Sequence, residues 1–228
     1  MYRGIAQREF ALGHNGNLTN TEELAHEAGM LPGTVTSDSD LVAELIGQCI
    51  SQTSNQNSSD GRELERSLVK VLPKLEGAFS FVLMDEANII GVRDPNGFRP
   101  LCLGKLENGW VLASETPALD IIGAHFIREI DPGEMVVISA TGVRSIHPFP
   151  TERINPNLCI FEFVYFARPD SIIDGISVYQ ARLNQGQRLA ERIIENFSNH
   201  DIDAVIPVPD SGRYAALQMA DTLGVEYR

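Results

Sequence analysis

The segment GHNGNLTN, residues 13–20, places an amide side chain next to a glycine at Asn15 and Gly16. Two interpretations are open. Asn-Gly accepts positive φ at both central positions of a tight turn, so the dipeptide is typical of a β-hairpin. The alternative is that the Asn15 amide and the Gly16 backbone N–H point at a bound group. Taken alone, the dipeptide favours the turn, and the choice depends on the other motifs in the chain.

A second candidate site lies in VIPVPDSGRY, where a short apolar strand is followed by the loop residues Asp210, Ser211 and Gly212 and then by a helix. Free N–H groups of the first helical turn, together with the helix dipole, favour binding of an anion at such a loop. The loop lacks the glycines and lysine of a Walker P-loop, which disfavours an ATPase. A simple helix N-cap is the alternative interpretation.

The elements that position these segments are predicted from periodicity and capping signals. Asn20 followed by Glu23 has the spacing of a capping box, and apolar residues at helical spacing predict helices within 36–50, behind a Ser/Asp cap, and within 61–75. From Gly77 the period changes to that of strands, which predicts an antiparallel meander with Pro-Asn-Gly of RDPNGFRP at a hairpin tip. Helices grouped before strands predict an α+β fold.

Prolines and polar residues accumulate in PFPTERINPNL, residues 148–158, and predict a boundary between residues 1–152 and residues 153–228. Beyond it, 175–197 reads as a long helix with an apolar face. The residues expected on that face are Leu183, Leu189, Ile193 and Ile194.

Composition narrows the class of protein. The 228 residues carry a formal net charge of −13, which repels nucleic acid and anionic membranes, and the sequence offers no basic patch to offset this. No apolar run reaches membrane-spanning length and no secretory signal is evident, so we expect a cytoplasmic protein that contacts neither membrane nor nucleic acid. Three cysteines without CxxC spacing support no disulfide framework, and Cys49 and Cys102 are expected to be buried, inert thiols.

Several motifs together resemble one family. In order along the chain, GHNGNLTN, TSDSD, GAFSFVLMDE, GVRDPNGFRPLCLG, ASETPALD, CIFEFVYFARPDSIIDGISVYQAR and VIPVPDSGR are similar to glutamine phosphoribosylpyrophosphate amidotransferases, or amidophosphoribosyltransferases, which are class II glutamine amidotransferases. The resemblance implies part of an N-terminal-nucleophile hydrolase, an αββα sandwich with glutaminase activity. It further implies that the start of an α/β type I phosphoribosyltransferase domain follows.

In this family glutamine is hydrolysed by an N-terminal cysteine whose α-amino group serves as the general base. By resemblance, the side-chain amide of Asn15 and the backbone N–H of Gly16 stabilise the oxyanion of the tetrahedral intermediate. Asp38 matches the carboxylate that holds the α-ammonium of glutamine. These roles favour the second interpretation of the Asn-Gly dipeptide.

The resemblance also assigns the C-terminal motifs. Ammonia attacks C1 of phosphoribosyl pyrophosphate to give phosphoribosylamine, the first committed step of purine synthesis; Asp210, Ser211 and Gly212 match the pyrophosphate loop, and Mg²⁺ accompanies that substrate. Tyr165 resembles the lining of the passage between the two sites. Cys159 stands where some members carry one ligand of a 4Fe–4S cluster. Homo-oligomers and feedback by AMP and GMP are expected on the same basis.

The chain departs from the family pattern at several places. No N-terminal cysteine and no acidic ribose-phosphate motif is present, so we expect an internal segment that is inactive by itself. Tyr214 replaces a usual proline, with little expected effect. Arg93, Arg99 and Arg168 are interpreted as structural.

The alternative function is a non-catalytic, degenerate module that binds glutamine or a nucleotide as a regulator. A third class, glucosamine-6-phosphate synthase, would share the HNG motif but would not explain the YFARPDS motif.

Overall fold

The computed structural model describes residues 2–5, 8–30, 36–53 and 61–228. Its contacts divide the chain into two compact units, the first made of residues 1–114 and 122–158 and the second of residues 115–121 and 159–228. The domain boundary expected after residue 152 stays a prediction.

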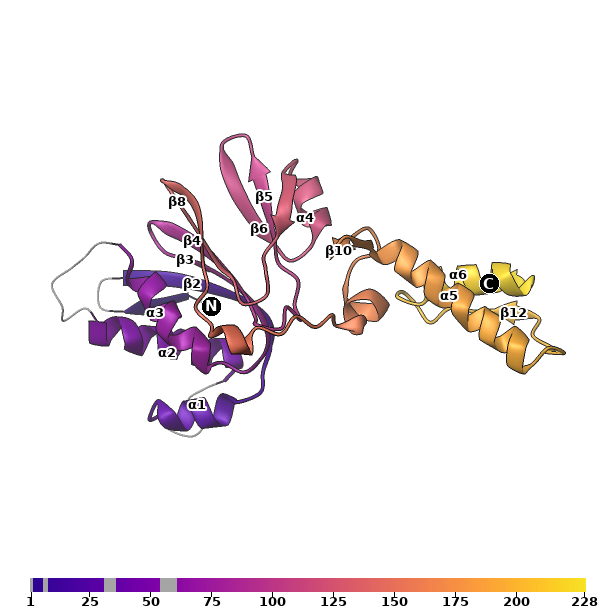
Figure 1. The fold of residues 1–228 in the computed structure, drawn as a ribbon, viewed down its shortest axis with the longest axis horizontal. Coiled ribbons are helices and arrows are strands. Elements are labelled where there is room, and N and C mark those ends of the chain that lie inside the picture. The colour runs from indigo at the N-terminus through magenta and orange to yellow at the C-terminus, as the bar shows by residue number, and fades with distance from the viewer. Residues whose placement is uncertain (1, 6–7, 31–35, 54–60) are drawn as a thin grey trace. The chain divides into compact units, whose positions relative to one another are not determined.

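The first unit contains two antiparallel sheets (Figure 1). One has six strands in the order β1-β2-β3-β4-β8-β9, and the other has three in the order β6-β5-β7. The strands of the larger sheet are β1 (Tyr2–Ile5), β2 (Arg8–Leu18), β3 (Gly77–Met84), β4 (Asn88–Arg93), β8 (Met135–Ser139) and β9 (Gly142–Ile146); those of the smaller sheet are β5 (Cys102–Leu106), β6 (Gly109–Ala113) and β7 (His125–Glu129).

This topology corrects two expectations from the sequence. The predicted single meander is wrong, because β4 pairs with β8 while β5 to β7 leave to form the second sheet. The predicted hairpin at RDPNGFRP is also wrong, since this segment links strands of different sheets. A turn does form there, closed by the Gly97 N–H, which donates to the Asp94 carbonyl at 3.0 Å.

Helices cover one face of the larger sheet and the smaller sheet covers the other. The alternation of β8 demonstrates this: Met135 and Val137 belong to the apolar cluster shared with the helices, whereas Val136 and Ile138 belong to the cluster shared with β5 and β6. The helices are α1 (Thr21–Glu27), α2 (Asp38–Thr53) and α3 (Glu63–Val71), followed by the short 3₁₀ turns η1 (Leu72–Lys74) and η2 (Thr151–Arg153). The predicted α+β sandwich is therefore confirmed.

Two capping predictions have different outcomes. Ser37 caps α2, because its Oγ accepts from the Asp40 backbone N–H at 3.2 Å. The capping box at α1 is wrong, since Asn20 makes no side-chain cap bond. Its amide instead bridges the segment before β3, donating to the Lys74 carbonyl at 3.0 Å and accepting from the Glu76 N–H at 3.1 Å. A long-range partner has replaced the local one.

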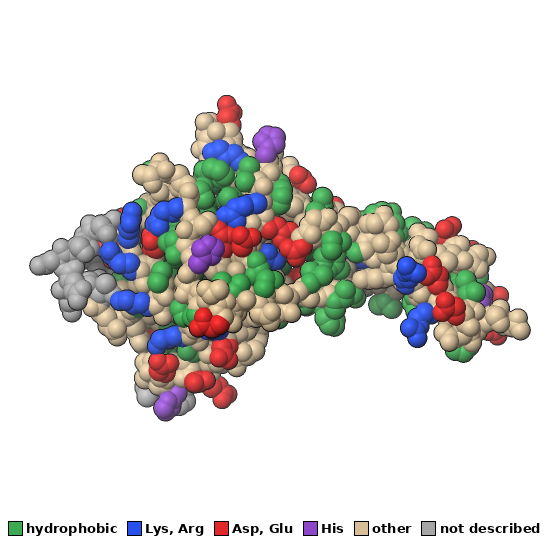
Figure 2. All heavy atoms as spheres, viewed as in Figure 1, with side chains coloured by type: hydrophobic (Ala, Val, Ile, Leu, Met, Phe, Trp, Pro, Cys, Tyr) green, Lys and Arg blue, Asp and Glu red, His purple; other side chains and the backbone are tan. Residues whose placement is uncertain are grey.

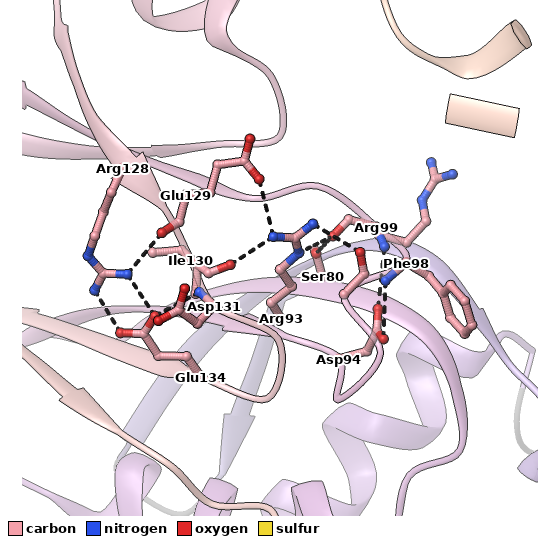
Figure 3. Close-up of polar contacts among 11 residues, drawn as sticks. Ser80, Arg93, Asp94, Phe98, Arg99, Arg128, Glu129, Ile130, Asp131 and Glu134 are labelled. Atoms are coloured by element: carbon pink, nitrogen blue, oxygen red, sulfur yellow. Dashed lines mark hydrogen bonds and ion pairs between the residues drawn. The ribbon is translucent and has the colours of Figure 1, made fainter. Parts of the chain in front are cut away.

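The turn before β8 is held by a buried carboxylate, Glu134, whose side chain is 2% exposed (Figure 3). Arg128 donates to both of its oxygens at 2.7 Å, and the Asp131 backbone N–H donates at 2.8 Å. Burial alone would raise the pKa of Glu134, but these bonds and one from Ser145 outweigh it and lower the pKa below its ordinary value of 4.5.

We therefore expect an acid-sensitive contribution to stability from Glu134. A carboxylate with a lowered folded-state pKa stabilises the fold fully above pH 4.5 and loses that contribution as the pH falls through the folded-state value. Glu134→Gln should lower the free energy of unfolding by about 2 kcal/mol at pH 7. It should also flatten the loss of stability between pH 5 and about pH 2, as measured by urea unfolding. Glu22→Gln, at an exposed position of α1, is the control. Equal acid sensitivity in Glu134→Gln and the native chain would contradict this.

The second unit packs two helices, α5 (Val178–Asn196) and α6 (Arg213–Leu223), against each other (Figure 1). Its other elements are α4 (Thr116–Ile121), the π-helical turn η3 (Glu162–Phe166), the hairpin β10 (Ile172–Ile173) and β11 (Ile176–Ser177), and the parallel pair β12 (Ala204–Val205) and β13 (Glu226–Tyr227). The predicted order of strand, loop and helix at VIPVPDSGRY is confirmed, with α6 beginning after Gly212.

The buried face of α5 differs from the predicted apolar stripe. Leu189 and Ile194 are 52% and 43% exposed, and the buried residues are instead Val178, Arg182, Gly186 and Ala190, at a spacing of four. A Cβ at Gly186 would lie 2.0 Å from the Ala215 carbonyl oxygen of α6. The closest approach of the two backbones, rather than the largest apolar side chains, thus selects the face.

The visible face in Figure 2 carries Lys and Arg side chains among Asp and Glu side chains rather than in one cluster. Within the described ranges, no helix has both the length and the apolar character needed to cross a membrane.

Candidate functional site

Asn15 and Gly16 lie within strand β2, so the hairpin-turn interpretation is wrong. In the ladder with β3, Asn15 is opposite Ser80 and Gly16 is opposite Phe79, and Ser80 is in turn opposite Arg93 of β4. Directly opposed residues of antiparallel strands share a face. Asn15 therefore lies on the face of Ser80 and Arg93, away from the helices.

The backbone of Gly16 has a conformation that requires glycine. Its φ is +148°, and a Cβ built there would lie 2.0 Å from the Ala78 carbonyl oxygen of β3. Glycine is thus required at this position by the close approach of the neighbouring strand β3.

The Asn15 amide has a defined orientation. Its Oδ1 accepts hydrogen bonds from Arg99 Nε at 3.1 Å and Nη2 at 2.5 Å, and its Nδ2 lies 3.4 Å from Ser114 Oγ. The side chain is half-buried. Its amide hydrogens are thus turned away from the guanidinium.

Asp38 begins α2 and its carboxylate lies against the same stretch of β2. Its Oδ2 accepts from the Leu18 backbone N–H at 3.2 Å, and its Oδ1 lies 3.4 Å from His14 Nδ1. The structure therefore brings Asp38 beside residues 14–18, the segment that contains Asn15 and Gly16. Their predicted roles with glutamine stay predictions.

His14 is a neighbour of this site that the sequence prediction missed. Its side chain is 3% exposed, packs on the Phe81 ring at 4.8 Å, and lies 3.1 Å from Ser39 Oγ through Nδ1. Burial lowers the pKa of His14 below 6.5, against the raising effect of Asp38, so the imidazole is neutral near pH 7. The position of His14 directly before the Asn-Gly dipeptide is the sequence feature that could have indicated its place at the site.

An open cleft of ≈ 560 Å³ adjoins this segment. Its lining includes Asn17 and Ala78, which flank the Gly16–Phe79 pair, together with Asn96 and Phe98 of the loop after β4. This lining does not include Asn15, Gly16 or Asp38.

The loop after β4 is fixed by two buried side chains (Figure 3). Asp94 accepts from four backbone N–H groups, and Arg93 donates to carbonyl oxygens of three residues. The Asp94 carboxylate accepts from the N–H groups of Phe79 at 3.2 Å, Asn96 at 2.9 Å, Phe98 at 3.3 Å and Arg99 at 3.4 Å. The Arg93 guanidinium donates to the carbonyl oxygens of Gly97 at 2.9 Å, Arg99 at 3.1 Å and Ile130 at 2.9 Å. Burial nevertheless raises the pKa of Asp94.

Arg93 thus has the structural role expected for it, while Arg99 contacts a candidate catalytic residue, which the sequence prediction missed. The Arg-Asp-Pro-Asn-Gly run was the signal for a rigid loop. Arg168 forms an exposed pair with Asp170 at 2.9 Å, and its backbone N–H donates to Glu115 at 2.8 Å.

The remaining predicted site residues lie in the second unit. Asp210, Ser211 and Gly212 form one loop, where the Asp210 side chain is 83% exposed and pairs with Arg213 at 2.9 Å. The Gly212 N–H donates to the Val208 carbonyl at 3.2 Å. Tyr165 lies on η3 and is 63% exposed.

Four further residues named from the sequence have these positions. Tyr214 packs edge-on against the Tyr179 ring at 5.0 Å. Cys102 is buried as expected, whereas Cys49, which was also expected to be buried, is half-buried, as is Cys159.

Comparisons with known proteins agree with the motifs. The sequence profile described as a glutamine amidotransferase domain matches residues 1–121, which is more than half of the 228 residues. An amidophosphoribosyltransferase of Mycobacterium leprae is 43% identical over 236 residues, covering 100% of this chain and 39% of the relative. That of Bacillus subtilis is 38% identical over 230 residues, covering 100% of this chain and 44% of the relative.

Solved structures give the same result. The glutamine phosphoribosylpyrophosphate amidotransferase of B. subtilis, complexed with ADP and GMP, is 37% identical with a TM-score of 0.81, covering 99% of this chain and 46% of that one. A structure described as the allosteric regulatory enzyme of purine biosynthesis has a TM-score of 0.82 at 37% identity, covering 100% of this chain and 46% of that one. The chain thus spans less than half of these relatives. The resemblance to amidophosphoribosyltransferases is confirmed, and the chain belongs to the glutamine amidotransferase domain family.

Proposed function

We propose that the gene product carrying this chain is an amidophosphoribosyltransferase of purine biosynthesis. It would hydrolyse glutamine to glutamate and ammonia, and the ammonia would displace pyrophosphate from C1 of phosphoribosyl pyrophosphate to give phosphoribosylamine. The observation that carries the proposal is the Asn15 amide, whose oxygen is held by Arg99 and whose N–H₂ group is turned the other way, with Nδ2 3.4 Å from Ser114 Oγ.

The proposed glutaminase chemistry uses this geometry. When a nucleophile attacks the glutamine amide carbon, its oxygen becomes anionic, and the Asn15 N–H and the Gly16 backbone N–H stabilise that charge. Each such donor contributes about 3–4 kcal/mol to transition-state stabilisation. Asp38 would receive the α-ammonium of glutamine, which selects the free amino acid over a peptide-bound amide. The nucleophile is assigned, by family resemblance alone, to an N-terminal cysteine.

The proposed phosphoribosyl site uses Asp210, Ser211 and Gly212 for pyrophosphate, with Tyr165 lining the passage for ammonia. The described residues do not fit a resident metal site: within them, no group of three His, Cys, Asp or Glu side chains is placed to hold an ion. We propose that Mg²⁺ accompanies the substrate phosphates, as the family resemblance implies. A 4Fe–4S cluster requires four thiolates, of which Cys159 would be one.

Regulation and assembly are proposed from the relatives. A related structure is complexed with ADP and GMP, which supports nucleotide control of this protein as well. We further propose a homo-oligomer in the cytoplasm, as for a biosynthetic enzyme of this family.

The test is an assay of the intact gene product for glutamine-dependent phosphoribosylamine formation, with Asp38→Asn as the diagnostic variant. Loss of one charge-assisted hydrogen bond should raise KM for glutamine by about 10- to 100-fold, while ammonia-dependent synthesis is unchanged. Asp120→Asn, an exposed carboxylate of α4, is the control. Glutamine binding without turnover of either substrate would favour the non-catalytic regulatory module instead.

A further inference from the structure

We propose that Arg99 is a positioning residue for glutamine hydrolysis: it fixes the orientation of the Asn15 amide so that the N–H₂ group, and not the carbonyl oxygen, faces the substrate oxygen. This inference rests on the proposed function and adds a residue to it. Arg99 lies 84 positions from Asn15 in the sequence, and its guanidinium would not touch the substrate.

The chemistry of the two groups allows one orientation. A guanidinium carries only donors, whereas an amide has an acceptor oxygen at one end and a donor nitrogen at the other. With Nε at 3.1 Å and Nη2 at 2.5 Å, two donors of Arg99 converge on Oδ1. Rotating the amide by 180° would place its N–H₂ group against these donors. The two bonds would be lost and the donors would clash.

This orientation matters because an amide of the opposite orientation would repel the reacting group. The oxyanion-stabilising function requires an N–H aimed at the position where negative charge develops. A carbonyl oxygen at that position would face the anion with its own partial negative charge. Fixing the amide before the substrate binds also removes the cost of orienting it during the reaction.

The backbone of Arg99 is itself held in place. Its carbonyl accepts from Arg93 Nε at 3.1 Å and from Ser80 Oγ at 2.9 Å, and its N–H lies 3.4 Å from Asp94 Oδ2 (Figure 3). Ser80 is the residue opposite Asn15 in the ladder between β2 and β3. The loop that carries the guanidinium is therefore bonded to β2 through the Arg99 side chain and to the neighbouring strand β3 through the Arg99 backbone.

Arg93 provides a contrast within the same loop. Its side chain is 4% exposed, donates to backbone carbonyls and pairs with Glu129 at 3.3 Å, which is the pattern of an arginine that stabilises a loop. The half-buried Arg99 instead donates to the side chain of a proposed catalytic residue. The structural role expected for both arginines from the sequence is thus extended for Arg99.

The experiment is a double-mutant cycle on glutamine hydrolysis by the intact gene product, with the native protein, Arg99→Gln, Asn15→Ala and the double variant. Misplacing a catalytic group by about 1 Å can cost about 100-fold, so Arg99→Gln should lower kcat by roughly 10- to 100-fold with KM for glutamine within about twofold. In the Asn15→Ala background the same change should cost less than about threefold. Arg99→Lys, which restores a single donor, should recover part of kcat.

The control is Arg144→Gln, which removes an arginine paired with Glu65 elsewhere in the first unit and should leave kcat unchanged. Additive losses in the cycle, or a raised KM with kcat unchanged, would overturn the inference in favour of a structural or a substrate-binding arginine. If the native protein hydrolyses no glutamine, the proposed function fails by itself. The contact between Arg99 and Asn15 is then tested by thermal unfolding of the four proteins. Additive changes in their unfolding free energy would refute this contact.

Discussion

Replacing Asn15 with aspartate is expected to lower kcat for glutamine hydrolysis by about 10²–10³-fold while leaving the fold intact. A carboxylate has the shape of the amide and would still accept the two bonds from Arg99, now as an ion pair. It has no N–H, however, and it places negative charge where the oxyanion forms. The measurement is steady-state glutaminase kinetics of the intact gene product, together with its melting temperature.

The matched control is Asn108→Asp, which makes the same chemical change at an exposed position of the β5–β6 turn. It should leave kcat and KM unchanged. Asn15→Ala should lose a similar factor in kcat but also lose stability, because the donors of Arg99 are left without that acceptor. An Asn15→Asp protein that retains more than about a tenth of native kcat would refute the role of this amide.

Replacing Gly16 with alanine is expected to destabilise the first unit by about 2–5 kcal/mol, the combined cost of overpacking and of a non-glycine residue at positive φ. A Cβ there would lie 2.0 Å from the Ala78 carbonyl oxygen and 2.8 Å from the Phe79 Cα, and both are backbone atoms of β3 that move only if the ladder opens. Urea unfolding measures the loss. Glutamine hydrolysis should fall as well, because the displaced backbone carries the second proposed oxyanion donor.

Gly13→Ala on the same strand is the control, since the Val82 carbonyl oxygen would lie 3.7 Å from the new Cβ, an ordinary contact. This change should alter stability by less than about 1 kcal/mol. Equal effects of the two substitutions would show that the close approach at Gly16 is not what requires glycine there.

Much of the local structure followed from the sequence by itself. The helical spacing behind Ser37, the strands after Gly77, and the strand, loop and helix around Asp210 all formed as predicted. These features depend on residues within one or two turns of each other, whose propensities and caps act through local contacts. The motif order also indicated the family, and with it the roles proposed for Asn15 and Asp38.

The tertiary structure alone decided which distant groups meet. Pairing of β4 with β8, the use of Asn20 as a bridge rather than a cap, and the burial of Gly186 rather than Leu189 each override a local preference. The contact between Arg99 and Asn15 belongs to the same class. Its partners lie 84 residues apart, and their meeting depends on how a loop crosses from one sheet to the other, which is set by the packing of both sheets together rather than by any pattern near either residue.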